Sequence, residues 1–159
     1  MTPKTPYAIT GLDPAPFAQL FGQPEAVLAA QGVIRVAVET KPSAPCRITL
    51  EDAEPGETVL LLNHEHLAVD TPYRSRHAIY VRETAAPAAR YVDEVPPALA
   101  VRLLALRAFD AEDMMIDAEV VEGAELPAMI ERFFADPRTA YLHAHYARRG
   151  CFAARVDRA

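Results

Sequence analysis

The sequence has no apolar run close to the roughly 20 residues that a membrane-spanning helix needs. Its first residues, MTPKTPYAIT, also lack the apolar segment of a secretory signal peptide. Cysteine is scarce, with only Cys46 and Cys151 and no C-x-x-C motif, so the pattern does not indicate a disulfide framework. These absences predict a soluble cytoplasmic protein whose two thiols stay reduced and form no bond with each other.

Positive charge is also in short supply, since sixteen basic residues face twenty-two acidic ones and the net charge is −6. Only Arg148 and Arg149 are adjacent, so the clustered basic surface of a nucleic-acid binder is missing. Attraction to an anionic membrane surface is disfavoured for the same reason. All the basic residues except Lys4 and Lys41 are arginines. This bias reflects either a GC-rich genome or guanidinium groups that hold a carboxylate or phosphate.

What remains is a globular composition, with 51% apolar and 24% charged residues. A chain of 159 residues buries roughly 68–70% of its unfolded surface and therefore needs no covalent staples. No internal repeat or long linker divides the sequence. We therefore expect a single domain over residues 1–159.

The spacing of apolar residues and turn formers predicts both helices and strands. Helices are expected at 14–31, 96–104 and 123–135, and strands at 33–39, 47–50, 58–63, 77–83, 105–109, 114–121, 141–147 and 151–157. The last two strands should form a hairpin in which Gly150 takes a positive φ. This order predicts an α+β fold, with one mostly antiparallel twisted sheet and two to three helices packed on it.

A thirteen-residue polar stretch, HEHLAVDTPYRSR, follows the buried strand 58–63 and is predicted as a long loop. Loops of this length inside a compact domain are often functional. At its end Tyr73, Arg74 and His77 could clamp an anionic small molecule. The alternative is a solvated loop whose arginines pair with nearby acids.

Histidine occurs in an unusual arrangement, because four of the five histidines form two H-x-H pairs. The pairs are His64 with His66 and His143 with His145. On a strand, residues i and i+2 share a face, so each pair could offer two nitrogen ligands to a metal. A third ligand could come from Glu65, Asp70 or Asp117. Surface or hydrogen-bonded histidines are the alternative, and without an unambiguous third ligand the sequence predicts no stoichiometric metal and no cofactor.

The two cysteines leave a similar choice. If the predicted hairpin forms, Cys151 approaches the end of the strand that carries His143 and His145, with Arg148 and Arg149 beside it. Such neighbours would populate a reactive thiolate. A half-buried structural cysteine is the alternative, and the same alternatives apply to Cys46.

Four segments occur in an order that resembles a known bacterial family, the domain of unknown function 1203. They are CRITLEDAEPGETVLLLNHEH, PYRSRHAIYVRE, MMIDAEVV and YLHAHYARRGCFAARVDR, and the resemblance extends over about residues 9–158. It implies a small, stand-alone bacterial protein and carries no activity, substrate or cofactor. The family-like positions are Cys46-Arg47, His66, Pro72-Tyr73-Arg74, His77, His143 and Gly150-Cys151-Phe152. Residues other than histidine occur in the family at positions 64 and 145, which weighs against a metal site built from both pairs.

The leading hypothesis is one polar pocket that binds or transforms a small anionic molecule. Arg47, Tyr73 and Arg74 would bind the ligand, and thiol or acid–base chemistry would come from Cys46, His66, His77, His143 or Cys151. A non-catalytic interaction protein, such as a homodimer through its sheet, is the first alternative. The second is a mononuclear metal enzyme that uses His64, His66, His143 and His145. Neither nucleic acid nor a membrane is an expected partner, and the sequence leaves open whether the protein is an enzyme.

Overall fold

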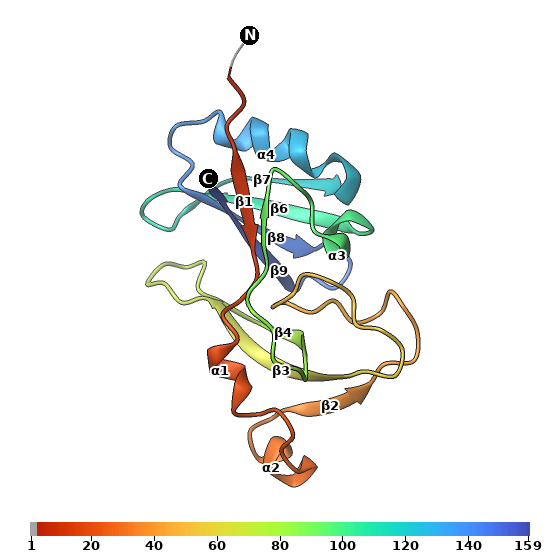
Figure 1. Cartoon of the computed structure of the whole chain (residues 1–159). Coiled ribbons are helices and arrows are strands. Elements are labelled where there is room, and N and C mark those ends of the chain that lie inside the picture. The colour runs from red at the N-terminus through yellow and green to blue at the C-terminus, as the bar shows by residue number, and fades with distance from the viewer. Residues whose placement is uncertain (1–2) are drawn as a thin grey trace.

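The computed structural model describes residues 3–159, which form nine β-strands in two antiparallel sheets together with four short helices (Figure 1). The α+β class and the antiparallel pairing are therefore confirmed. The strands divide into two sheets, however, where the sequence led us to expect one.

The larger sheet has six strands in the order β5-β1-β9-β8-β6-β7. Their bounds in chain order are β1 (Tyr7–Thr10), β5 (Arg90–Val92), β6 (Leu103–Phe109), β7 (Met115–Glu122), β8 (Tyr141–Tyr146) and β9 (Phe152–Arg158). The smaller sheet contains β2 (Ile34–Ala37), β3 (Thr58–Leu67) and β4 (Ser75–Arg82), with β3 in the middle. The helices are α1 (Ala15–Ala18), α2 (Glu25–Ala30), α3 (Pro97–Ala100) and α4 (Leu126–Phe134).

Helix α4 covers one face of the larger sheet, above it in the view of Figure 1. Its apolar stripe, which includes Leu126, Ile130 and Phe133, is buried in the same core as Leu106 and Leu142 of the sheet. The helix predicted at 123–135 and its role in the core are thus confirmed.

The smaller sheet has a second core, on the side where α1 and α2 lie (Figure 1). Phe17 of α1 and Leu28 of α2 pack in it with Leu60, Leu62 and Ile79. Each sheet therefore has its own helices and its own apolar core. The polar residues that concern function lie where the two sheets approach each other.

Several elements differ from the sequence-based expectation. The helix expected at 14–31 is interrupted, because Gly22 has a φ of +73° and α2 starts only after Pro24. Residues 47–50 form a turn instead of a strand, and Leu50 has a φ of +57°. Strands β1 and β5 lie side by side at one end of the larger sheet and are too short, at four and three residues, for their alternation to be recognised.

The long loop expected at 64–76 is much shorter in the structure. Strand β3 continues to Leu67 and β4 begins at Ser75, with His64 directly opposite His77. Polar side chains at the end of this hairpin remain compatible with pairing because the backbone, and not the side chains, makes the ladder. His64 and His66 are therefore strand residues, and only residues 68–74 form the loop.

One ion pair joins β2 to the end of β4. Arg35 donates from Nε and Nη2 to the Glu83 carboxylate at 2.7 and 2.5 Å, and the backbone amide of Gly22 and the hydroxyl of Thr58 also donate to it. These bonds lower the pKa of Glu83 from its ordinary value of 4.5 to about 2. The carboxylate is only 7% exposed, so its partners are not freely replaced by water.

We expect Glu83→Gln to destabilise the protein at pH 7 by about 1–2 kcal/mol after allowance for solvent screening. Because the lowered pKa favours the charged form in the folded state, this contribution is complete above about pH 5 and is lost as the pH falls towards 2. Urea denaturation at pH 7 and pH 3 measures the difference. Glu39→Gln, at an exposed position, is the matched control, and an equal loss for Glu83→Gln at both pH values would contradict the prediction.

Candidate functional site

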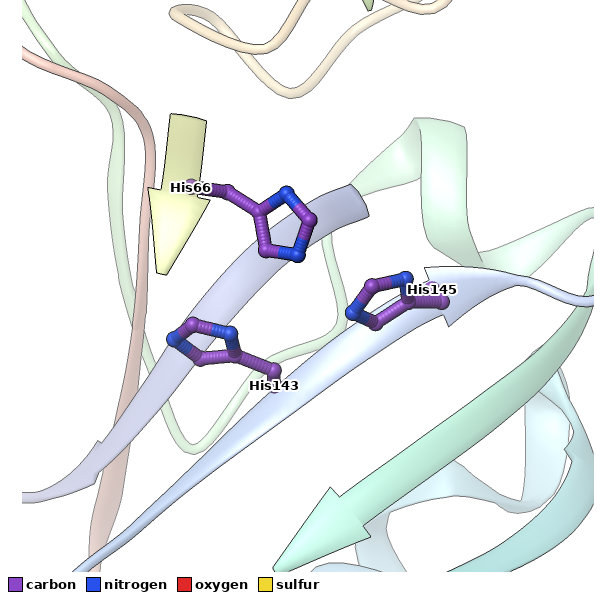
Figure 2. A group of neighbouring side chains, drawn as sticks. All are labelled: His66, His143 and His145. Atoms are coloured by element: carbon purple, nitrogen blue, oxygen red, sulfur yellow. The ribbon is translucent and has the colours of Figure 1, made fainter. Parts of the chain in front are cut away.

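Three histidines from the two sheets meet in one cluster. One nitrogen each of His66, His143 and His145 lies within 4.8 Å of the others, and the three rings face one another in Figure 2. Within residues 3–159 this is the one group of at least three potential ligands with such spacing, and no carboxylate belongs to it. His64 lies outside it and packs against Phe17, with the ring centroids 5.6 Å apart.

Strand geometry explains the meeting. His143 and His145 lie two residues apart on β8 and so share a face of the larger sheet, with ring centroids 6.4 Å apart. In β3 the register shifts between Glu65 and Leu67, which leaves His66 without a partner on β4. A bulge of this kind redirects the side chain it carries. The His66 ring stacks on Phe152 of the larger sheet, and the His64 ring packs against Phe17 of α1.

Burial keeps all three imidazoles neutral at pH 7. His143 and His145 are 2% and 1% exposed, and desolvation lowers the pKa of each to about 3. The pKa of half-buried His66 falls to about 4, mainly through desolvation and also through nearby positive charge. Neutral imidazole is the form that binds a metal ion.

Hydrogen bonding orients one ring and leaves the others incomplete. Nδ1 of His145 lies 3.0 Å from the Gly150 carbonyl oxygen, which can only accept, so Nδ1 carries the proton and Nε2 keeps its lone pair. Nδ1 of His66 and Nδ1 of His143 are buried and have no hydrogen-bond partner in the part of the chain that the structure describes. Leaving a buried polar atom unpaired costs about 1–3 kcal/mol, so the cluster has unused capacity for a ligand.

Aromatic side chains surround the cluster. Phe152 stacks on His66 with a centroid distance of 5.0 Å, and its centroid is 4.9 Å from that of His143. Phe109 and Tyr141 flank His143 at 5.5 and 5.4 Å. This apolar shell holds the rings in place and lowers the local dielectric.

Arg107 adds a positive charge on the same side of the sheet. It lies on β6 directly opposite His143, and directly opposed residues share a sheet face. Burial lowers its pKa, and within residues 3–159 it makes no ion pair. The cluster therefore has a cationic neighbour that no acid neutralises.

A second feature is a cavity of about 280 Å³, and Cys151 forms part of its lining. It is lined by Ser43, Pro45, Arg47, Tyr80, Val101, Arg102, Leu103, Glu122, Tyr146, Arg148, Arg149 and Cys151. Arg47 is 1% exposed and donates to the carbonyl oxygens of Phe152 at 2.8 Å and Pro45 at 2.6 Å. Its third bond runs from Nη2 to Sγ of Cys151 over 3.0 Å.

Tyr146 lies between two of the arginines in this cavity. The guanidinium carbons of Arg47 and Arg102 are 4.8 and 5.2 Å from its ring centroid. Burial raises the pKa of Tyr146 to about 12, and its hydroxyl has no hydrogen-bond partner among residues 3–159. Arg102, unlike Arg47, has a carboxylate partner, because it donates twice to Asp52 at 2.8 and 2.7 Å.

The structure thus separates residues that the sequence placed in one pocket. Arg47 and Cys151 share the cavity, while His66 and His143 belong to the histidine cluster. His77 lies at the margin of both, 6.5 Å from His66 between ring centroids and with Nε2 near Gly150.

The other three candidates belong neither to the three-histidine cluster nor to the lining of the cavity. Arg74 has a 55% exposed side chain and pairs with Glu65 and Asp70, which matches the solvated-loop alternative. Tyr73 packs edge-on against Phe109. Cys46 is fully buried, and its sulfur accepts a bond from the backbone amide of Arg82 at 3.3 Å. Both cysteines are free, as predicted.

Sequence reasoning missed Arg107, Arg102, Asp52 and Tyr146. A signal existed for Arg107, since it is the one charged residue in the apolar strand LLALRAF. No local signal existed for the others, because Asp52 reaches Arg102, and Tyr146 reaches the cavity, from segments far apart in the chain.

Fold and site together define an α+β protein with a buried three-histidine cluster between two antiparallel sheets. The chain belongs to the family described as "Protein of unknown function (DUF1203)", which matches residues 43–158. That range contains the histidine cluster and every residue that lines the cavity, whereas β1, α1, α2 and β2 precede it. No curated protein and no solved structure matches the chain. None of the helices in residues 3–159 has the length and apolarity to cross a membrane.

Proposed function

We propose that the protein binds one divalent transition-metal ion, such as Zn²⁺, through His66, His143 and His145. The observation that carries this proposal is the convergence of three neutral imidazoles whose ligand atoms lie within 4.8 Å of one another. Zinc–nitrogen bonds of about 2.0–2.1 Å require closer nitrogens, so binding of the ion would draw the three rings together. The bond from His145 to the Gly150 carbonyl supports the proposal, since metal-binding histidines commonly donate their second N–H to such an acceptor.

The donor set favours a reactive centre over a purely structural one. Structural zinc sites are usually closed by four protein ligands, whereas catalytic sites have three and keep a position for water or substrate. Imidazole donors suit Zn²⁺, Fe²⁺, Ni²⁺ and Cu²⁺ rather than Mg²⁺ or Ca²⁺. We therefore assign the protein to metal-dependent enzymes that act on a small molecule.

The charges around the three histidines indicate which kind of group would be the fourth ligand of the ion. Three neutral ligands leave the full positive charge on the ion, and Arg107 adds to it from the neighbouring strand. Like charges repel and an anion relieves that repulsion. The fourth ligand of such an ion would therefore be hydroxide or the anionic group of a substrate, such as a carboxylate.

This proposal replaces the sequence-based prediction of a metal-free protein. That prediction depended on the lack of a clear third ligand for either H-x-H pair, and the approach of His66 to His143 and His145 supplies one. The two free thiols support the cytoplasm as its location, because a reducing compartment keeps them unpaired.

Metal titration of tag-free protein tests the proposal. After removal of bound metal, the wild type should take up one Zn²⁺ or Co²⁺ per chain, and Co²⁺ should report nitrogen coordination in its visible spectrum. His143→Ala should weaken binding at least a hundredfold. His145→Asn should do the same, because its amide can still donate to Gly150 but offers no atom in place of Nε2.

The control is His64→Ala, which removes a histidine two residues from His66 but outside the cluster. It should bind metal as tightly as the wild type. Folded wild-type protein that takes up no ion, or one-to-one binding that survives His143→Ala, would overturn the proposal.

A further inference from the structure

We propose that the cavity beside Cys151 is a binding site for a small organic anion, separate from the metal centre. None of His66, His143 and His145 lines this cavity of about 280 Å³. The shared chemistry of its ligand is an oxyanion on a compact organic body, found both in carboxylic acids and in phosphate esters. The inference stands without the proposed metal.

Positive charge predominates in the lining of the cavity. Four arginines line the cavity, namely Arg47, Arg102, Arg148 and Arg149, against the single carboxylate of Glu122. Arg102 has its own partner in Asp52, and Arg148 and Arg149 are exposed. Arg47 is buried and, within the described part of the chain, bonds only two carbonyl oxygens and the sulfur of Cys151. A buried cation without a carboxylate is unfavourable, and an anion in the cavity supplies the missing charge.

Tyr146 provides the cavity with a hydroxyl group that can donate a hydrogen bond. Tyr146 is only 6% exposed and lines the cavity, and no group in the described residues 3–159 forms a hydrogen bond with its hydroxyl. Contacts of its ring with Arg47 and Arg102 hold the ring in position. An oxyanion beside these groups would accept from both the hydroxyl and a guanidinium.

The walls of the cavity are partly apolar. Pro45, Tyr80, Val101 and Leu103 contribute apolar surface next to the arginines. A site for a bare inorganic ion needs no such surface, whereas an organic acid or ester buries its carbon skeleton there. The occupant is therefore amphipathic, with one anionic end.

Alkylation of Cys151 provides a direct test, because this residue lines the cavity. When iodoacetate or iodoacetamide reacts with Cys151, the thiolate sulfur attacks the methylene carbon of the reagent, the carbon–iodine bond breaks and iodide leaves. Iodoacetate and iodoacetamide undergo the same substitution but differ in charge. The rate with iodoacetate is divided by the rate with iodoacetamide, first for Cys151 and then for free cysteine. The first ratio divided by the second measures how strongly the cavity attracts an anion, and we expect the result to exceed ten. Cys46 is fully buried and is the internal control that stays unmodified in folded protein.

Variants connect this preference to the cavity. Tyr146→Phe removes only the hydroxyl, and Arg149→Ala removes an exposed lining charge. Each should reduce the preference for iodoacetate several-fold. Arg132→Ala, at an exposed arginine outside the cavity, is the matched control and should leave it unchanged. His143→Ala should also leave it unchanged, so failure of the metal proposal remains distinguishable.

Protection by ligands separates the two sources of the anion. Phenyl phosphate and benzoate are compared as inhibitors of alkylation by iodoacetamide, with benzyl alcohol as the neutral analogue that should not protect. Stronger protection by one anion identifies the phosphate-ester or the carboxylate class. If Cys151 resists alkylation, calorimetric titration with both anions decides, and binding that weakens in Tyr146→Phe supports the proposal. A rate ratio equal to that of free cysteine, or no calorimetric binding at about 10 mM of either anion, overturns it.

Discussion

Zn²⁺ added in excess to the metal-free protein should raise its midpoint of thermal unfolding by roughly 8–16 °C. An ion that binds only the folded state adds about 4.1 kcal/mol at a thousandfold excess over Kd. For a chain of this size each kcal/mol shifts the midpoint by about 2–4 °C. Differential scanning calorimetry in the presence and absence of Zn²⁺ measures the change.

The position of the ligands makes this effect specific. His66 belongs to the smaller sheet and His143 to the larger one, and each sheet has its own apolar core. An ion held by both would therefore tie the smaller sheet to the larger one. His66→Ala removes the only ligand from the smaller sheet and should abolish the shift, while His64→Ala should keep it.

Mg²⁺ is the control ion, since it prefers oxygen ligands and an octahedral geometry. It should leave the midpoint of unfolding unchanged. A Zn²⁺ shift of equal size in His66→Ala would show that the ion binds elsewhere and would contradict the prediction.

Replacing Arg47 should produce the second large effect, a loss of stability, because this side chain connects the turn after Cys46 to the larger sheet. Its guanidinium reaches from the turn after Cys46 to the carbonyl of Phe152, 105 residues away in the chain. Arg47→Met preserves an apolar stem of similar length but leaves the carbonyls of Phe152 and Pro45 without their donor. Two buried acceptors left unpaired at about 1–3 kcal/mol each predict a loss of roughly 3 kcal/mol after the apolar gain.

Arg47→Lys should recover only part of this loss. A single ammonium group keeps the charge but cannot donate to both acceptors, which lie at different edges of the guanidinium. Arg138→Met, at an exposed residue that pairs with Asp136, is the control and should change stability by less than about 0.5 kcal/mol. Urea denaturation measures all three variants, and an Arg47→Met protein as stable as the wild type would refute this role.

Local pattern was sufficient for much of the fold. The stripe in α4 has helical spacing, and the Gly150 turn joins two strands that do pair. The common face of His143 and His145 also followed from strand alternation alone. These features depend on residues within a few positions of one another, where periodicity and turn chemistry decide the conformation.

The sites depended on tertiary structure. His66 is the bulged residue after Glu65, and the packing of the smaller sheet against the larger one brings it to β8, some 77 residues further along the chain. Nothing in the local sequence marks that bulge, since it reflects how β3 and β4 pair. The amino-acid sequence by itself determined the α+β class, the amphipathic helix, the closing hairpin and the paired histidines of β8. Only the packing of two sheets against each other decided that a third histidine completes the cluster and that Arg47, Tyr146 and Cys151 share a cavity, because such contacts join segments whose separation no local pattern encodes.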